Sequence, residues 1–269
     1  MATIRPTAVA GMFYPENPES LKNMIKKFLD EAHVYANLPL PKGIIAPHAG
    51  YVYSGSVAAS AYACLKNAQK LIKNVVLLAP AHHYPMHGIA TTAANLHATP
   101  LGNILIDQIK IEQLTSAEKA LVTICEDAFT YEHAIEVHLP FLQMTLANDF
   151  SIIPLIVGSA SIQAVEDVLE KLWNGPETLI IISSDLSHYS EYETALKLDK
   201  KTAELITSFA AKTISPENAC GAYPMRGFLS LAHKKNLTAK IIDMRNSGDT
   251  AGDKNRVVGY GAFHFYEKK

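Results

Sequence analysis

Histidine and cysteine side chains carry most of the chemical potential of this 269-residue chain, which has eleven histidines and three cysteines. His48 directly follows the apolar run GIIAP, and the pair His82 and His83 follows the run NVVLLAPA. Imidazole and thiolate groups bind transition metals, and histidine also transfers protons near neutral pH. These positions therefore indicate a metal site or an acid–base site, although a lone histidine at a strand end is more often an ordinary hydrogen-bonded residue.

The pair of adjacent histidines limits what each can do. Neighbouring residues in an extended chain point in opposite directions, so His82 and His83 are not expected to reach the same ligand. One of them is expected to bind and the other to support it. The isolated Cys220 precedes a glycine near a predicted helix, but most such cysteines are small buried apolar residues, so the residue alone does not define a ligand.

The segment SSDLSHYS places Ser184, Asp185 and His188 close together, which raises the hypothesis of a serine hydrolase. In hydrolase triads the nucleophile and the base normally come from separate segments, and the chain has no Gly-x-Ser-x-Gly motif. A hydrolase is therefore the weakest of the alternatives. Asp185 and His188 fit acid–base or ligand-supporting roles better.

The segment EHAIEVHLP resembles a zinc metalloprotease helix only superficially. Its two histidines, His133 and His138, are five residues apart, whereas that motif needs them four apart around a glutamate. Glu132 or His138 could orient metal ligands by hydrogen bonding, but a satisfied polar residue with no such role is the more frequent case.

Alternating strand and helix patterns predict the frame that positions these residues. Apolar runs rich in Ile and Val predict strands at 43–47, 74–80, 151–158, 178–186, 239–244 and 257–265. Spacings of three and four between apolar residues predict helices at 17–32, 56–68, 161–174, 192–210 and 225–236, with a short one after Pro140. The fold class is therefore α/β, with a mixed, mostly parallel sheet between helical layers. Since ligands bind beyond the carboxyl ends of such strands, the histidine segments are expected to meet at one edge.

Composition excludes several classes of protein. A net charge of -2 and a pI near 6.6 offer no basic field, so neither nucleic acid nor a membrane surface is an expected partner. No leader pattern or membrane-length apolar run is visible, and an odd number of cysteines argues for a reducing compartment, so we expect a cytoplasmic protein. No linker or repeat divides the chain, which predicts a single domain over 1–269.

Seven separated motifs together resemble one family. AGMFYP, IIAPHAGYVYSG, LAPAHHYP, EHAIEVHLPFL, IIPLIVG, SSDLSHY and ACGAYPM occur in the order and spacing of the MEMO family, also called AmmeMemoRadiSam system protein B. The resemblance runs from about residue 8 to the C-terminal strand. It implies a fold similar to the class III extradiol dioxygenases, which are non-haem Fe(II) enzymes. It also implies a metal held by His48, His82 and Cys220, with Asp185 and His188 in the same pocket.

The implied cysteine stands where those dioxygenases have a carboxylate. A thiolate is a softer ligand, so the resemblance leaves the metal open, with iron or copper expected ahead of zinc. Two functions follow: a redox enzyme acting on a small organic substrate, or a non-catalytic protein that binds a metal or a peptide in the old pocket. The family also suggests a functional link to radical-SAM and AMMECR-type proteins. Tyr51 and Tyr53 are expected to alternate after the turn, and Phe13 or Tyr14 to add an aromatic wall.

Overall fold

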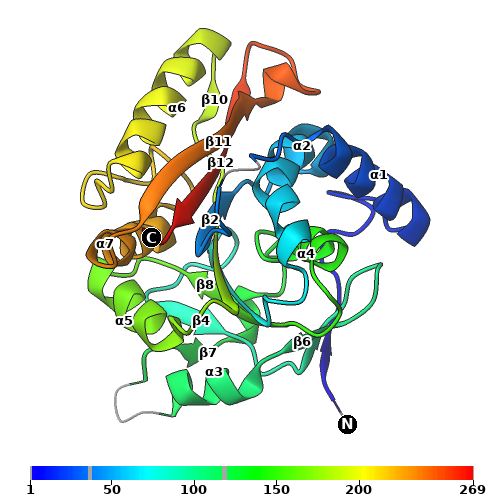
Figure 1. Cartoon of the computed structure of the whole chain (residues 1–269), viewed down its shortest axis with the longest axis vertical. Coiled ribbons are helices and arrows are strands. Elements are labelled where there is room, and N and C mark those ends of the chain that lie inside the picture. The colour runs from blue at the N-terminus through cyan, green and yellow to red at the C-terminus, as the bar shows by residue number, and fades with distance from the viewer. Residues whose placement is uncertain (1, 36–37, 117–119, 269) are drawn as a thin grey trace.

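The centre of the protein is a twisted sheet of long apolar strands (Figure 1). The computed structural model describes residues 2–35, 38–116 and 120–268. Its long strands are β2 (Gly43–Ala46), β3 (Asn74–Pro80), β8 (Ser151–Val157), β9 (Thr178–Ser183), β11 (Thr238–Asn246) and β12 (Val257–Tyr266). Shorter strands are β1 (Ile4–Arg5), β4 (Ile89–Thr91), β5 (Leu96–His97), β6 (Ile104–Ile106), β7 (Thr123–Ile124) and β10 (His188–Ser190). All six predicted strands are confirmed, and the short ones were not predicted because two or three residues show no periodicity.

The sheet is mixed, with a parallel centre. The strand order is β1-β5-β6-β8-β3-β9-β2-β12-β10, and β11 pairs with β12 outside this path. Strands β8, β3, β9 and β2 run parallel, whereas β12 pairs antiparallel with β2, β10 and β11. Nearly every residue of the four parallel strands is buried, as expected for strands covered on both faces.

Two helical layers cover the sheet, which confirms the predicted α/β fold class with a single domain. One layer contains α1 (Pro18–Glu31), α2 (Tyr51–Tyr62) and α4 (Leu139–Thr145), and the other contains α5 (Ile162–Leu172), α6 (Tyr192–Thr207) and α7 (Ala222–Lys234) (Figure 1). A further helix, α3 (Gln108–Thr115), packs beside β8, and short 3-10 turns include η1 (Ala63–Ala68), η2 (Glu126–Ala128), η3 (Glu136–His138) and η4 (Ser247–Asp249).

Helix starts follow local capping chemistry. The side chains of Asn17, Asp107 and Ser161 accept hydrogen bonds from backbone N–H groups in the first turns of α1, α3 and α5. Helix α2 begins at Tyr51, five residues before the predicted start, without a side-chain cap. The predicted strand-like alternation of Tyr51 and Tyr53 is therefore wrong. Both belong to one helical turn, in which Tyr51 is buried and Tyr53 is exposed.

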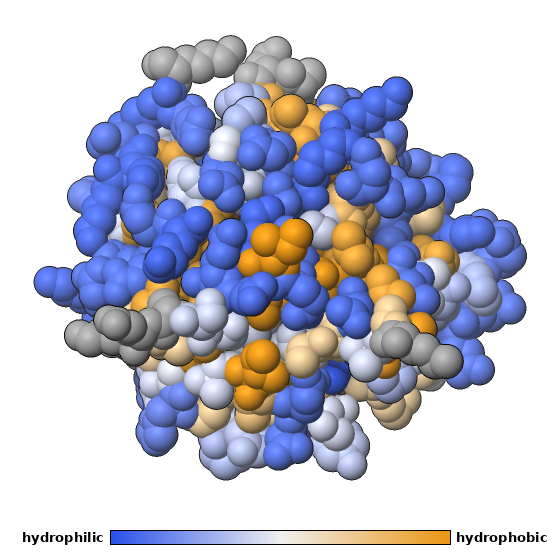
Figure 2. Space-filling model, turned by 90° about the horizontal axis from the view of Figure 1, so that it is seen from below, coloured by the Kyte–Doolittle hydropathy of each residue, from blue (hydrophilic) through white to orange (hydrophobic). Residues whose placement is uncertain are grey.

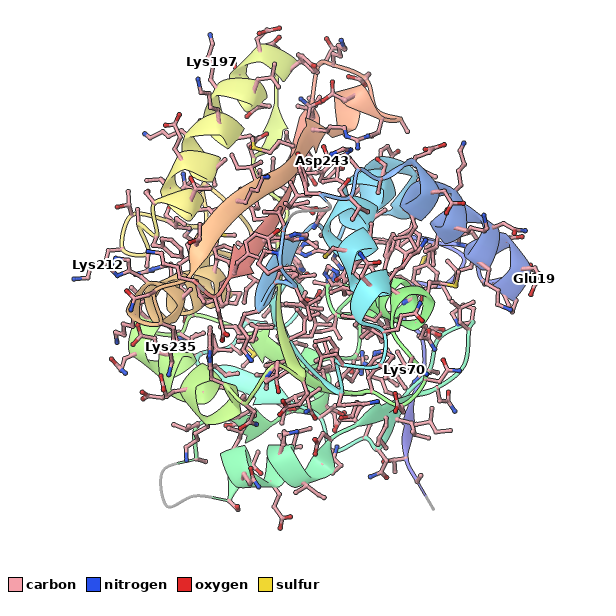
Figure 3. All side chains as sticks on the ribbon, viewed as in Figure 1. Glu19, Lys70, Lys197, Lys212, Lys235 and Asp243 are labelled. Atoms are coloured by element: carbon pink, nitrogen blue, oxygen red, sulfur yellow. The ribbon has the colours of Figure 1, made fainter. Side chains whose placement is uncertain are left out.

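Many charged side chains lie at the periphery of the molecule, although several, such as Glu132 and Asp185, are buried. The labelled side chains of Glu19, Lys197 and Lys212 lie at the outline of the molecule in Figure 3, and all three residues are exposed. The face shown in Figure 2 is mostly hydrophilic, with hydrophobic side chains in scattered groups. Within the described residues, no helix combines the length and the apolar character needed to cross a membrane.

Candidate metal centre

Three neighbouring parallel strands bring the candidate residues to one edge of the sheet. Strand β9 lies between β3 and β2, and the chain leaves all three at the same end. His48 follows β2, His82 follows β3, and Ser183 to Asp185 end β9 or follow it. The predicted convergence at the carboxyl edge is therefore observed.

His48 is fixed by three contacts. Its Nε2 lies 3.2 Å from the Sγ of Cys220, and its Nδ1 lies 2.6 Å from the hydroxyl of Ser183. Its backbone N–H donates to the Asp185 carboxylate at 2.8 Å. Pro47 ends the strand directly before it, so the buried imidazole is held at the rim with little freedom to rotate.

A count of protons around Ser183 fixes the tautomer of His48. The Ser183 hydroxyl has one hydrogen, which it donates to the carbonyl of Ala134 at 2.7 Å. Its two lone pairs then accept from Nδ1–H of His48 and from Nε2–H of His138, which lies at 2.8 Å. The Tyr62 hydroxyl donates to the remaining nitrogen of His138, also at 2.8 Å. Because His48 carries its proton on Nδ1, its Nε2 lone pair points at Cys220.

His82 is oriented by a buried carboxylate. Nδ1 of His82 donates to Glu132 at 2.9 Å, and the His82 backbone N–H donates to the same carboxylate at 2.7 Å. The backbone N–H of Ala134 adds a third bond at 2.9 Å. Although burial opposes ionisation, these bonds hold the pKa of Glu132 below its ordinary value. The carboxylate thus leaves Nε2 of His82 as the free nitrogen.

Cys220 reaches the edge because a glycine follows it. A side chain at Gly221 would lie 2.5 Å from the Ser183 carbonyl oxygen and 2.6 Å from the Ser184 Cβ, so only glycine allows this approach. Gly221 donates its backbone N–H to the Ser184 hydroxyl at 2.9 Å. The backbone N–H of Asp185 lies 3.2 Å from the sulfur and is oriented to donate to it.

Burial controls the charges at this edge. It lowers the pKa of His48 well below the ordinary value, with smaller contributions from the surrounding imidazoles, so His48 is neutral and able to bind a metal. Burial, followed by the Asp185 carboxylate, raises the pKa of the Cys220 thiol. Burial also raises the pKa of Asp185 to about 7. A cation bound beside the sulfur would offset its burial cost and release its proton.

The resulting group fits a metal ion. Ligand atoms of His48, His82 and Cys220 all lie within 4.8 Å of one another. Nε2 of His48 and Sγ of Cys220 lie 3.2 Å apart, close enough for both atoms to bind one metal ion. Two imidazoles and one thiol form a donor set that suits a transition metal.

The two candidate acid–base residues occupy different positions. Asp185 is buried beside His48 and Cys220, as a supporting role requires. His188 is exposed at the start of β10, close enough to His48 for its charge to influence that imidazole. The Ser184 hydroxyl donates to the Asp185 carbonyl, accepts from Gly221 and contacts no imidazole among the described residues. This arrangement does not favour the hydrolase hypothesis.

Sequence reasoning gave Ser183 and His133 no specific role in the site. The ring of His133 stacks on the ring of His82, with centroids 4.9 Å apart. The ring of Phe13 also packs against His133, with centroids 4.7 Å apart. His82, Glu132 and His133 also form a second group of adjacent ligand atoms within the 4.8 Å limit. The density of polar residues in EHAIEVHLP was the available signal for His133, whereas only Glu132 and His138 of this segment were considered as residues that orient metal ligands. His83 lies beside His133, with ring centroids 6.1 Å apart, and belongs to neither group.

Comparisons with known proteins agree with the motifs. A family model described as Memo-like protein matches residues 5–264. A MEMO1 family protein of Methanosarcina barkeri is 34% identical over 271 residues, which cover 96% of this chain and 98% of the relative. MEMO1 family proteins of Saccharolobus islandicus and Thermoplasma volcanium are each 32% identical, over 97% and 96% of this chain and 99% and 97% of the relatives. The chain therefore belongs to the Memo family.

Proposed function

We propose that the protein binds one transition-metal ion through Nε2 of His48, Nε2 of His82 and Sγ of Cys220. One observation carries the proposal: the Nδ1 atom of each histidine is already committed, to Ser183 and to Glu132 respectively. The free lone pairs therefore belong to the nitrogens available beside the sulfur. Second contacts of this kind orient the histidine ligands of metal sites.

The proposed ion is iron or copper ahead of zinc. One thiolate and two imidazoles suit a redox metal of intermediate or soft character, and three protein ligands leave coordination positions open. When bound, such an ion would supply a Lewis acid and a one-electron redox centre. The proposed activity is oxidation or reduction of a small organic substrate in a dioxygenase-like pocket.

In this proposal the chain's own residues handle protons and orientation. Asp185 holds the backbone of His48 and donates its own backbone N–H toward Cys220, which stabilises the thiolate. His188 lies exposed at the same edge, where its imidazole can exchange a proton with a substrate and with water. Ser183 keeps the His48 proton on Nδ1.

One observation favours the alternative of a non-catalytic binding protein. Asp185 bonds the backbone of His48, and no hydrogen bond joins it to His188 among the described residues. An acid–base pair would need such a bond to fix the imidazole. In the alternative, the same ligands hold the metal without turnover and the pocket takes a small molecule or a peptide.

Metal analysis of protein purified without oxygen tests the binding site. We expect close to one iron or copper ion per chain, and a loss of nearly all of it in His82→Ala, which removes one ligand. The matched control is His87→Ala, because His87 is exposed and bonds Ser159 rather than the cluster. Equal metal contents in the two variants would refute the assignment of His82.

Oxygen uptake separates the two functions. Metal-loaded protein is supplied with small redox-active phenols, and the enzyme hypothesis predicts uptake that falls at least about tenfold in His188→Gln while the metal content stays constant. Full metal occupancy without oxygen uptake with any substrate would support the binding protein.

The three free cysteines also fit our proposal of a cytoplasmic location, since that compartment keeps thiols reduced.

A further inference from the structure

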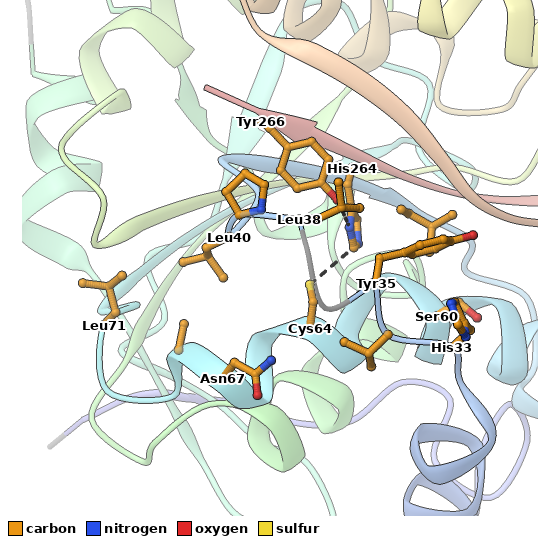
Figure 4. A pocket seen from close by; sticks show the side chains of 14 residues that line it. His33, Tyr35, Leu38, Leu40, Ser60, Cys64, Asn67, Leu71, His264 and Tyr266 are labelled. Atoms are coloured by element: carbon orange, nitrogen blue, oxygen red, sulfur yellow. Dashed lines mark hydrogen bonds between the residues drawn. The ribbon is translucent and has the colours of Figure 1, made fainter. Parts of the chain in front are cut away.

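A second cavity lies away from the metal centre. It has a volume of about 310 Å³ and is bounded by residues 33–35 and 38–40, by helix α2 with η1 and Leu71, by Ile242 of β11 and by the last residues of β12 (Figure 4). None of its lining residues belongs to the His48–His82–Cys220 group. Ligand sites in proteins start at about this volume, so the cavity is large enough for a small molecule of one or two rings.

On the inner wall of the cavity, both ring nitrogens of His264 already have hydrogen-bond partners. Nδ1 of His264 accepts from the Tyr266 hydroxyl at 2.9 Å, and its Nε2–H donates to the Ala61 carbonyl at 2.8 Å. The Cys64 sulfur lies 3.9 Å from the same imidazole. Burial raises the pKa of the Cys64 thiol to about 12, so this wall offers an uncharged sulfur and ring surfaces rather than a nucleophile or a metal ligand.

The other walls divide into an apolar end and an aromatic end. Leu40 and Leu71 lie at one end, and Tyr35, His33 and Ser60 lie at the other (Figure 4). The ammonium of Lys240 lies 3.8 Å from the centroid of the Tyr35 ring. Lys240 itself is not among the residues that line the cavity. Flat rings of Tyr35, Tyr266 and two histidines favour a flat partner, because aromatic rings pack by stacking or edge contacts.

The lining carries no acidic residue, lysine or arginine. Each of four other cavities of the described residues has at least one such side chain, for example Asp149, Lys212, Lys42 and Arg5 respectively. A charged ligand would lose its hydration here without gaining a counter-ion. An uncharged ligand loses little and gains the apolar contacts.

We propose that this cavity is a second binding site, which takes an uncharged aromatic molecule of one or two rings. The ligand lies with its ring between the leucine end and Tyr35, over the sulfur of Cys64. This site does not depend on the proposed metal function, because no residue is shared between them.

Binding of Prodan, an uncharged naphthalene dye whose emission shifts to the blue in apolar surroundings, tests the proposal. The full-length protein should bind it saturably with one site per chain. Ala68→Phe places a ring inside the cavity and should weaken binding at least about tenfold. The matched control is Ala251→Phe, at an exposed turn outside the cavity, which should bind like the unmodified protein.

A second variant covers the case in which Ala68→Phe misfolds. Leu71 is 44% exposed at the cavity edge, so Leu71→Asp should fold normally yet weaken Prodan binding at least about tenfold by adding a charge to the wall. Naphthol should displace the dye. Naphthalenesulfonate, which is charged, should need a concentration at least about tenfold higher for the same displacement. Thermal melting of each variant and its metal content should stay unchanged.

Three results would overturn the second site. The first is no saturable binding, and the second is equal affinity in Leu71→Asp and the unmodified protein. The third is loss of dye binding in His82→Ala with retention in Ala68→Phe, which would place the dye in the metal centre instead. None of these bears on whether His82 holds metal, so the two proposals can fail separately.

Discussion

The described part of the chain contains two cysteine–histidine pairs, and only one of these two has the properties of a metal site. Cys220 lies 3.2 Å from His48, and Cys64 lies 3.9 Å from His264. His48 uses one ring nitrogen for Ser183, whereas His264 uses both, for Tyr266 and Ala61. Proximity of the two residue types is therefore insufficient, and the free lone pair makes the difference.

The backbone around each sulfur supports the same distinction. Cys220 faces the N–H group of Asp185, a donor that stabilises a thiolate. Cys64 contacts the carbonyl of Ala61 at 3.8 Å, an acceptor that favours the protonated thiol. Burial raises the pKa of both thiols, so each is protonated without a metal, and the backbone N–H of Asp185 would stabilise the Cys220 thiolate once a cation binds.

Replacement of each sulfur in turn tests the difference between the two pairs most directly. Cys220→Ser should weaken metal binding on the order of 100-fold or more, because it removes a ligand whose loss should exceed that of any supporting contact. Cys64→Ser should bind metal like the unmodified protein. Competition with a chelator of known affinity measures both.

Unchanged metal affinity in Cys220→Ser would show that the Cys220 sulfur is not a metal ligand. Equal losses in the two variants would show that the effect comes from general destabilisation. Melting temperatures recorded on the same samples distinguish these cases.

The next largest effect concerns the carboxylate behind His82. Glu132→Gln should weaken metal binding about 10- to 100-fold, because the amide holds the Nδ1–H of His82 less strongly. Glu136 is the matched control: it is also buried and accepts from Ala8, Val9 and Tyr14, but from no histidine. Glu136→Gln should lower stability and leave the metal affinity of folded protein unchanged. A similar loss of affinity in both variants would contradict a specific role for Glu132.

The family resemblance implied that Cys220 lies beside His48 and His82. The sequence pattern itself predicted the long strands, the helices between them and the meeting of the His48 and His82 segments at one edge. Continuous runs of Ile and Val are typical of strands that are buried on both faces. Parallel strands end at a common edge of the sheet, so the residues that follow them are expected to meet there. The structure confirms the single-domain α/β fold that these patterns predicted.

Contacts between distant segments were beyond this reasoning. Ser183 joins His48 and His138 across 135 and 45 residues of sequence, and no local pattern marks a serine that accepts from two imidazoles. The early start of α2 at Tyr51 was missed because Gly50 offers no side-chain cap. The cavity at Cys64 depends on four segments that meet only in the folded chain.

The smallest predicted effect concerns the pH dependence of stability at the second pair. Burial lowers the pKa of His264 to about 4, whereas an unfolded histidine has a pKa near 6.5, so the unfolded chain binds more protons between these values. Stability therefore rises with pH across this window and is lost as the pH falls below about 6.5, by about 1 kcal/mol between pH 6.5 and 5.5. In His264→Gln that contribution disappears, while other buried histidines such as His97 and His138 titrate as before. Urea unfolding of both proteins at the two pH values, with the metal removed, should give curves whose stability difference shrinks at the lower pH. A difference that stays constant would mean that His264 does not titrate on unfolding, and the view of this pair as a neutral, fully bonded wall would lose its support.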